Sequence, residues 1–76
     1  MERQLIWQLV RAADETAECY VQPTLSGGLG ITIYGGSSTI FTALATDLKT
    51  AQQLIAERKS ALLRDGWNAV YEHPAW

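Results

Sequence analysis

The chain has few residues that could form a covalent cross-link or bind a metal. Its 76 residues include one cysteine, Cys19, and one histidine, His73. A single cysteine excludes an internal disulfide, and this pair falls short of the three or four ligands that a zinc site needs. No metal or cofactor is therefore expected. Because a domain this small buries little of its surface, oligomerisation or a tight partner is the favoured source of added stability.

Long apolar runs and an excess of basic charge are also missing. No stretch reaches the roughly 18 apolar residues of a membrane-spanning helix, and the start of the chain lacks the basic region of a secretory leader. We therefore expect no membrane association and a cytoplasmic location, which a lone thiol suits. Six basic and eight acidic residues give a net charge of −2. Direct binding to nucleic acid, which favours a basic surface, is therefore not expected.

Charge is absent from the middle of the chain, where no residue from Cys19 to Thr46 is charged. Three short strands are predicted within this neutral segment, over residues 19–22, 29–34 and 39–45. The prediction is based on their β-branched and aromatic residues and on the proline and glycine turns between them. Sequential strands usually pair with their neighbours, so a three-stranded meander is expected.

The second and third predicted strands differ in how clearly they define an inward face. Residues 29–34 alternate, and one side carries Leu29, Ile31 and Ile33. Residues 39–45 are apolar on both sides, so either face could point into the core. The glycines before residue 31 run into a strand with no lysine after them, which favours a plain turn over a phosphate-binding loop.

The charged ends of the chain are predicted to be helical. Residues 2–17 have an apolar stripe at helical spacing and no glycine or proline. A second helix is expected to begin after Thr46 or Asp47, either of which could cap it, and to end at Gly66. Residues 68–72 follow as a fourth strand.

These elements predict an α+β fold in the order α-β-β-β-α-β. Both helices are expected to pack on one face of an antiparallel sheet, because that arrangement buries both apolar stripes. A single domain over residues 1–76 is expected, with residues 73–76 as a candidate loose tail.

Two surfaces are candidates for binding a protein partner. The first is the polar face of the predicted helix over residues 2–17, where Trp7 lies among charged residues, since tryptophan and arginine are enriched in binding hot spots. The second is the uncharged sheet, whose strands carry no lysine to protect their edges and could add a strand from another chain. Trp76 is a further candidate anchor. The full candidate set is Arg3, Trp7, Arg11, Asp14, Glu18, Tyr20, Thr32, Tyr34 and Trp76.

The favoured function is a small non-enzymatic protein-binding module. We expect an inhibitor or adaptor, of the kind that phages or mobile elements encode, which occupies a surface of a larger protein such as a host nucleic-acid-processing or defence complex. Self-association as a homodimer is also expected. One alternative is a small enzyme that pairs the Cys19 thiolate with the His73 imidazole. The other is a single-stranded nucleic-acid binder that stacks bases on Tyr20, Tyr34 and Phe41.

Overall fold

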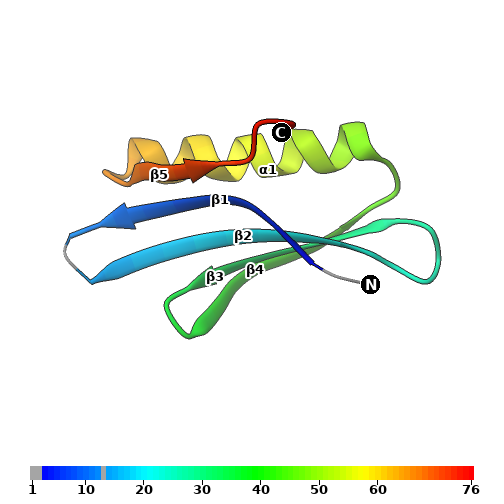
Figure 1. The fold of residues 1–76 in the computed structure, drawn as a ribbon, viewed down its shortest axis with the longest axis horizontal. Helices are drawn as coiled ribbons and strands as arrows, with labels where there is room; N and C mark the ends of the chain where they lie inside the picture. The colour runs from blue at the N-terminus through cyan, green and yellow to red at the C-terminus, as the bar shows by residue number, and fades with distance from the viewer. Residues whose placement is uncertain (1–2, 13) are drawn as a thin grey trace.

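The computed structural model describes residues 3–12 and 14–76, which form a five-stranded antiparallel sheet and one helix (Figure 1). The elements in chain order are β1 (Gln4–Arg11), β2 (Glu15–Pro23), β3 (Leu29–Gly35), β4 (Ser38–Ala45), α1 (Leu48–Arg64) and β5 (Asn68–Glu72). The strands lie side by side in the order β4-β3-β2-β1-β5. The helix therefore carries the chain from one edge of the sheet to the other.

The helix predicted over residues 2–17 is wrong, and so are the α-β-β-β-α-β order and the packing of two helices on one face. The segment forms β1 and the start of β2, which pair from Arg11 and Glu15 onward. The turn between them includes Ala12, at φ 60°. Sheet pairing outweighs the local helix preference of this segment, because the pairing buries apolar side chains on both strands. Glu2 and Ala13, which the prediction included, lie outside the described residues.

The meander of β2, β3 and β4 is confirmed, although β2 begins at Glu15 and is longer than predicted. The inward face predicted for β3 is correct, since Ile31 and Ile33 are buried. On β4 the inward face is the one that carries Phe41 and Ala45. The fourth predicted strand, residues 68–72, is confirmed as β5, which pairs with β1.

The predicted helix after Asp47 is confirmed, with its caps. The Asp47 carboxylate accepts a hydrogen bond from the Thr50 backbone N–H at 2.8 Å, which satisfies a free donor of the first turn. At the other end Gly66 adopts φ 93°, and the Trp67 N–H donates to the Leu62 carbonyl at 3.1 Å. This geometry ends the helix with satisfied carbonyls and turns the indole of Trp67 toward the core.

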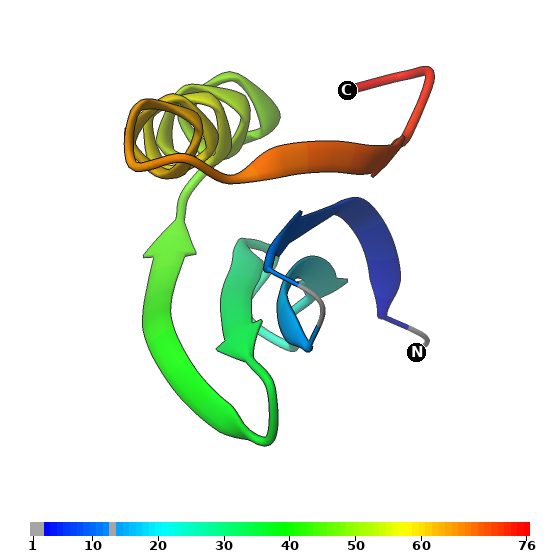
Figure 2. The same cartoon turned by 90° about the vertical axis from the view of Figure 1, so that its left-hand side faces the viewer.

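The core lies between α1 and one side of the curved sheet, next to β5 and the end of β4 (Figure 2). Its buried members are Ile6, Trp7, Leu9, Ala17, Cys19, Val21, Ile31, Ile33, Ala45, Ala51 and Ile55. Within the described residues no other helix is present, so the opposite side of β2 and β3 has no helical cover. The helix that is present is too short and too polar to cross a membrane.

Candidate functional site

The uncovered side of the sheet brings together five of the predicted site residues. The register pairs Glu18 with Tyr34 and Tyr20 with Thr32 across β2 and β3. These side chains point away from the core because they alternate with buried neighbours on each strand. We call this surface the tyrosine face, defined by Arg3, Glu18, Tyr20, Thr32 and Tyr34.

A network of close contacts holds the tyrosine face together. The Arg3 guanidinium lies over the Tyr20 ring at 4.3 Å from its centroid, and it donates to the Tyr34 hydroxyl at 3.1 Å. The two tyrosine rings meet edge to face at 5.7 Å. The Tyr20 hydroxyl donates to Glu18 at 3.3 Å, and the Gln8 side-chain amide donates to the same carboxylate at 3.1 Å. These contacts therefore hold the two rings in one arrangement.

The electrostatics of the tyrosine face are balanced. It carries one cation, Arg3, and one anion, Glu18. Desolvation first, and then the nearby Glu18 carboxylate, raise the pKa of the Tyr20 hydroxyl. The phenol therefore stays neutral and keeps its hydrogen bond to Glu18. Such a surface has no net charge to attract a polyanion.

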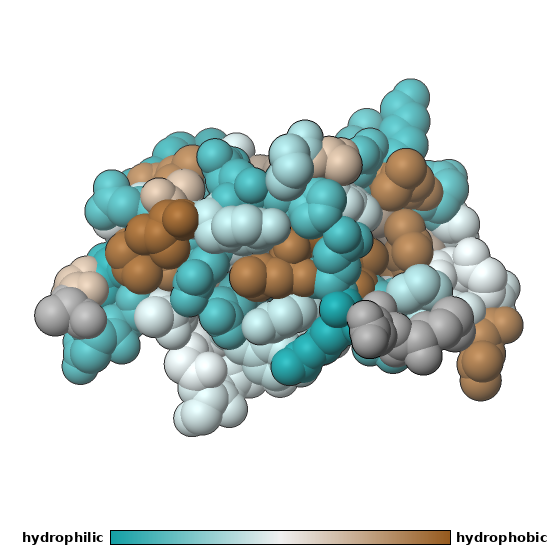
Figure 3. Space-filling model, in the orientation of Figure 1, coloured by the Kyte–Doolittle hydropathy of each residue, from teal (hydrophilic) through white to brown (hydrophobic). Residues whose placement is uncertain are grey.

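The tyrosine face continues to the free edge of β4. Thr42 pairs with Thr32 across β3 and β4, and Leu44, opposite Gly30, lies on the same side. Leu44 is 79% exposed, and β4 carries no charge. Ile40 stands at a bulge between the Ile33–Phe41 and Tyr34–Thr39 pairs, and its side chain lies beside Gly35 on the core side of the sheet. Natural edge strands usually carry a charge, a proline, a bulge or a cover, and β4 has this bulge. On the side of the molecule drawn in Figure 3, hydrophobic residues form separate patches among polar ones.

The other predicted site residues lie elsewhere. Trp7 is 2% exposed, so the expectation of an exposed indole on a polar helix face is wrong. A register shift in β1 between Leu5 and Trp7 lets both Ile6 and Trp7 enter the core. Trp76 is half-buried and packs against the same core.

Arg11 ties the β1–β2 hairpin to the end of α1. It donates to Glu15 at 3.1 Å and to Asp65 at 2.7 Å, and it lies over the Trp67 ring at 4.8 Å. The hydrogen bond from Arg11 is the main cause that lowers the pKa of Glu15. Arg11 is therefore occupied by internal contacts.

The acidic pair expected from helical spacing does not form. Asp14 lies in the turn before β2, whereas Glu18 belongs to the tyrosine face. Among the described residues no cluster of histidine, cysteine and carboxylate side chains could hold a metal ion.

The geometry argues against the proposed pair of Cys19 and His73. Cys19 is fully buried on β2, and burial raises the pKa of its thiol to about 12. At neutral pH this leaves almost no thiolate, which is the reactive form. His73 follows β5 and is separated from β2 by β1. Its Nδ1 accepts from the Ala75 N–H at 3.1 Å, and its Nε2 lies 2.6 Å from the Gln4 side-chain amide.

The proposed stacking platform for bases is also incomplete. Phe41 lies on the core side of β4, opposite to the tyrosines, with the Arg58 guanidinium 3.9 Å above its ring. Tyr20 and Tyr34 pack against each other, and Arg3 covers them. They do not present separate ring faces to successive bases.

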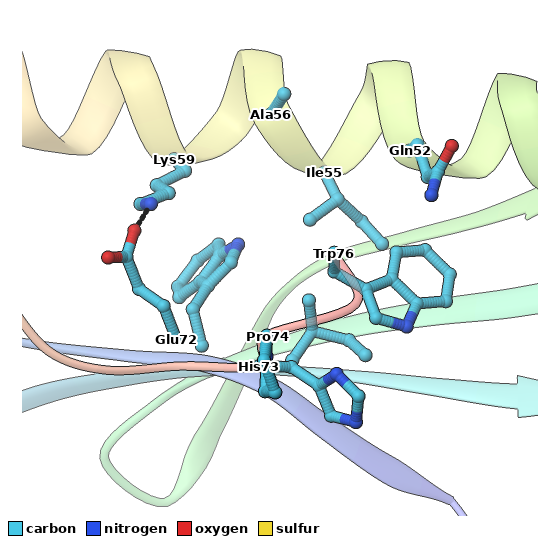
Figure 4. A pocket seen from close by; sticks show the side chains of 10 residues that line it. Gln52, Ile55, Ala56, Lys59, Glu72, His73, Pro74 and Trp76 are labelled. Atoms are coloured by element: carbon cyan, nitrogen blue, oxygen red, sulfur yellow. Dashed lines mark ion pairs between the residues drawn. The ribbon is translucent and has the colours of Figure 1, made fainter.

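A cleft of about 450 Å³ lies between α1 and the turn after β5, and no sequence pattern predicted it. Figure 4 shows Gln52 and Trp76 toward one end of the cleft, Lys59 and Glu72 forming an ion pair toward the other, and Ile55 between them. The cleft exists because the chain rises from the end of β5 toward α1, so the turn after β5 faces the helix (Figure 1). Strand alternation could have located the tyrosine face, but no local pattern predicts this juxtaposition.

Comparison with known proteins gives no relative, since no protein family, curated protein or solved structure matches the chain.

Proposed function

We propose that this chain is a small non-enzymatic protein-binding module that pairs with a second copy of itself along β4 and binds a partner protein through the tyrosine face. The observation that carries the proposal is an uncovered, neutral sheet face that runs to a free, uncharged edge strand. Tyrosine and arginine side chains held rigid before binding lose little entropy in a complex, which favours their use as contact residues.

Self-pairing follows from the exposed residues of β4 beyond its bulge. In an antiparallel pair centred on Ala43, Leu44 of one copy lies opposite Thr42 of the other, and the reverse holds by two-fold symmetry. Each pair would cover a leucine side chain that is now 79% exposed. No charge on β4 opposes the approach. The result would be a continuous ten-stranded sheet with both tyrosine faces on the same side.

The partner of the tyrosine face would be a neutral protein surface rich in hydrogen-bonding groups. The face offers a tyrosine donor, one arginine and one carboxylate within a small area, all fixed by the contacts described above. A module of this kind suits an inhibitor or adaptor, such as one encoded by a phage or mobile element. The single buried thiol suits a reducing compartment such as the cytoplasm.

Self-association is tested by sedimentation equilibrium over a wide range of concentrations. The wild-type chain and Val70→Lys should dimerise, because Val70 is exposed on β5 at the opposite edge of the sheet. Leu44→Lys should remain a monomer, because each pair would lose its leucine and bring a lysine ammonium into the seam. A monomeric wild type, or a dimer unaffected by Leu44→Lys, would refute pairing along β4.

Partner binding is tested by quantitative capture from the native host. Tyr34→Lys should lose a partner that both the wild type and Val70→Lys retain. The substitution removes the hydroxyl that accepts a hydrogen bond from Arg3 and places a second cation beside that arginine. The tyrosine face is not the binding surface if Tyr34→Lys captures the same proteins in the same amounts as Val70→Lys.

A further inference from the structure

The cleft beside α1 contains a hydrogen-bond donor that has no acceptor. Trp7 lines the cleft, and its indole N–H is buried with no partner among the described residues. A buried donor without an acceptor is unfavourable, and native structures rarely keep one without a reason. The cleft therefore has a place for a hydrogen-bond acceptor beside the Trp7 indole.

The charged groups of the cleft already satisfy each other. Glu72 is the cross-strand neighbour of Trp7, and its carboxylate pairs with the Lys59 ammonium on α1. No unpaired ammonium in the described lining calls for an anionic ligand. The remaining lining combines the apolar side chains of Ile6, Ile55, Pro74 and Trp76 with the polar side chains of Gln52 and His73. The complementary ligand is therefore uncharged, has an apolar body, and carries an acceptor oxygen for the indole N–H.

The turn after β5 forms one wall of the cleft. The His73 N–H donates to the Ile6 carbonyl at 2.7 Å, which fixes the start of the turn. Beyond this point the hydrogen bonds lie within the turn, from the Trp76 N–H to the His73 carbonyl and from the Ala75 N–H to the His73 ring. Trp76 packs against the core and lines the cleft. Because the indole nitrogen of Trp7 is buried, a ligand oxygen reaches it only when a lining side chain shifts.

We propose that this cleft binds a small, uncharged, mostly apolar molecule with a carbonyl oxygen that accepts a hydrogen bond from the Trp7 indole N–H. Its apolar body would lie between Ile55 and Trp76. A volume of about 450 Å³ is within the range of small-ligand sites. The site is independent of the tyrosine face, which lies on the other side of the sheet.

Nuclear magnetic resonance of the indole N–H groups tests the proposal directly. The chain has three tryptophans, and Trp67 does not line the cleft, so its signal is an internal reference. Titration with 1-indanone should move the Trp7 signal downfield in a saturable way and leave the Trp67 signal in place. Indane, which has the same shape without the oxygen, should bind at least about tenfold more weakly, the usual discrimination for one hydrogen bond.

Matched variants separate the cleft from general surface binding. Gln52→Phe enlarges a side chain that points toward Trp76 (Figure 4) and should weaken 1-indanone binding at least about tenfold. Gln53→Phe places the same substitution at an exposed position of the same helix outside the cleft and should leave binding unchanged. In Trp7→Phe, which lacks the indole N–H, 1-indanone and indane should bind with equal affinity. The proposal is overturned if 1-indanone produces no saturable shift, if indane binds equally well, or if benzoate binds more tightly than 1-indanone.

Discussion

The buried thiol of Cys19 should make the stability of this fold sensitive to alkaline pH. Burial raises the pKa of Cys19 to about 12, whereas a thiol in an unfolded chain ionises at about 8.5. The unfolded state therefore loses its proton first as the pH rises. The contribution of the neutral thiol is fully present below about pH 8.5 and is lost progressively as the pH rises toward the folded pKa. At pH 10 the expected loss is about 2 kcal/mol relative to pH 7.

Urea unfolding followed by circular dichroism at pH 7 and pH 10 measures this loss. Cys19→Ala provides the matched control, since it lacks the thiol but keeps the lysines and tyrosines that also titrate. The wild type should lose about 2 kcal/mol more than Cys19→Ala between the two pH values. Equal losses in the two proteins would refute the reasoning.

Thiol reactivity gives an independent measurement of the same burial. Cys19 should react slowly with an aromatic disulfide reagent in the folded chain and rapidly in urea, because the folded thiol is both protonated and inaccessible. Rapid labelling of the folded chain would contradict the structure and restore the thiolate hypothesis.

Three further substitutions test the elements of the fold. Leu9→Ala should lower the free energy of unfolding by about 2–5 kcal/mol, because Leu9 is fully buried on β1. Val10→Ala should lower it clearly less, because Val10 is half-buried on the same strand. Equal losses in urea titrations of the two variants would argue against this strand. Ala12→Gly should raise it by about 1 kcal/mol, because alanine at φ 60° is strained; no gain would argue against that turn. Asp47→Ala should lower the melting temperature and Asp47→Asn should largely preserve it. The Thr50 hydrogen bonds lower the pKa of Asp47, so the difference between wild type and Asp47→Ala should persist above the ordinary carboxyl pKa of about 4 and shrink as the pH falls further.

The N-terminal error shows where local pattern is ambiguous. Leu5 and Leu9 are spaced for a helix face, and Ala12 favours helix, so a helical interpretation satisfied the local rules. The residues that follow carried the opposite signal: Ala17 and Cys19 alternate with polar neighbours, as in a half-buried strand. The pairing of β1 with both β2 and β5 decides the outcome, and that pairing depends on residues far along the chain.

The two candidate surfaces also differ in how far the sequence predicts them. The tyrosine face was predictable in part, because the residue types and the neutral segment are visible in the sequence. Its network with Arg3 was not predictable, because Arg3 reaches Tyr34 across 31 positions of sequence. The cleft could not be predicted from the sequence, because it depends on how the turn after β5 approaches α1.

The sequence by itself determined the neutral meander, the capped helix and the last strand, because each is specified by nearby residues: alternation, a capping carboxylate and a glycine at positive φ. Only the tertiary structure decided that residues 4–11 and 15–17 form strands, that Trp7 is buried, and which side of the sheet is left uncovered. These features depend on which distant strands pair, and long-range pairing outweighs local preference when it buries more apolar surface.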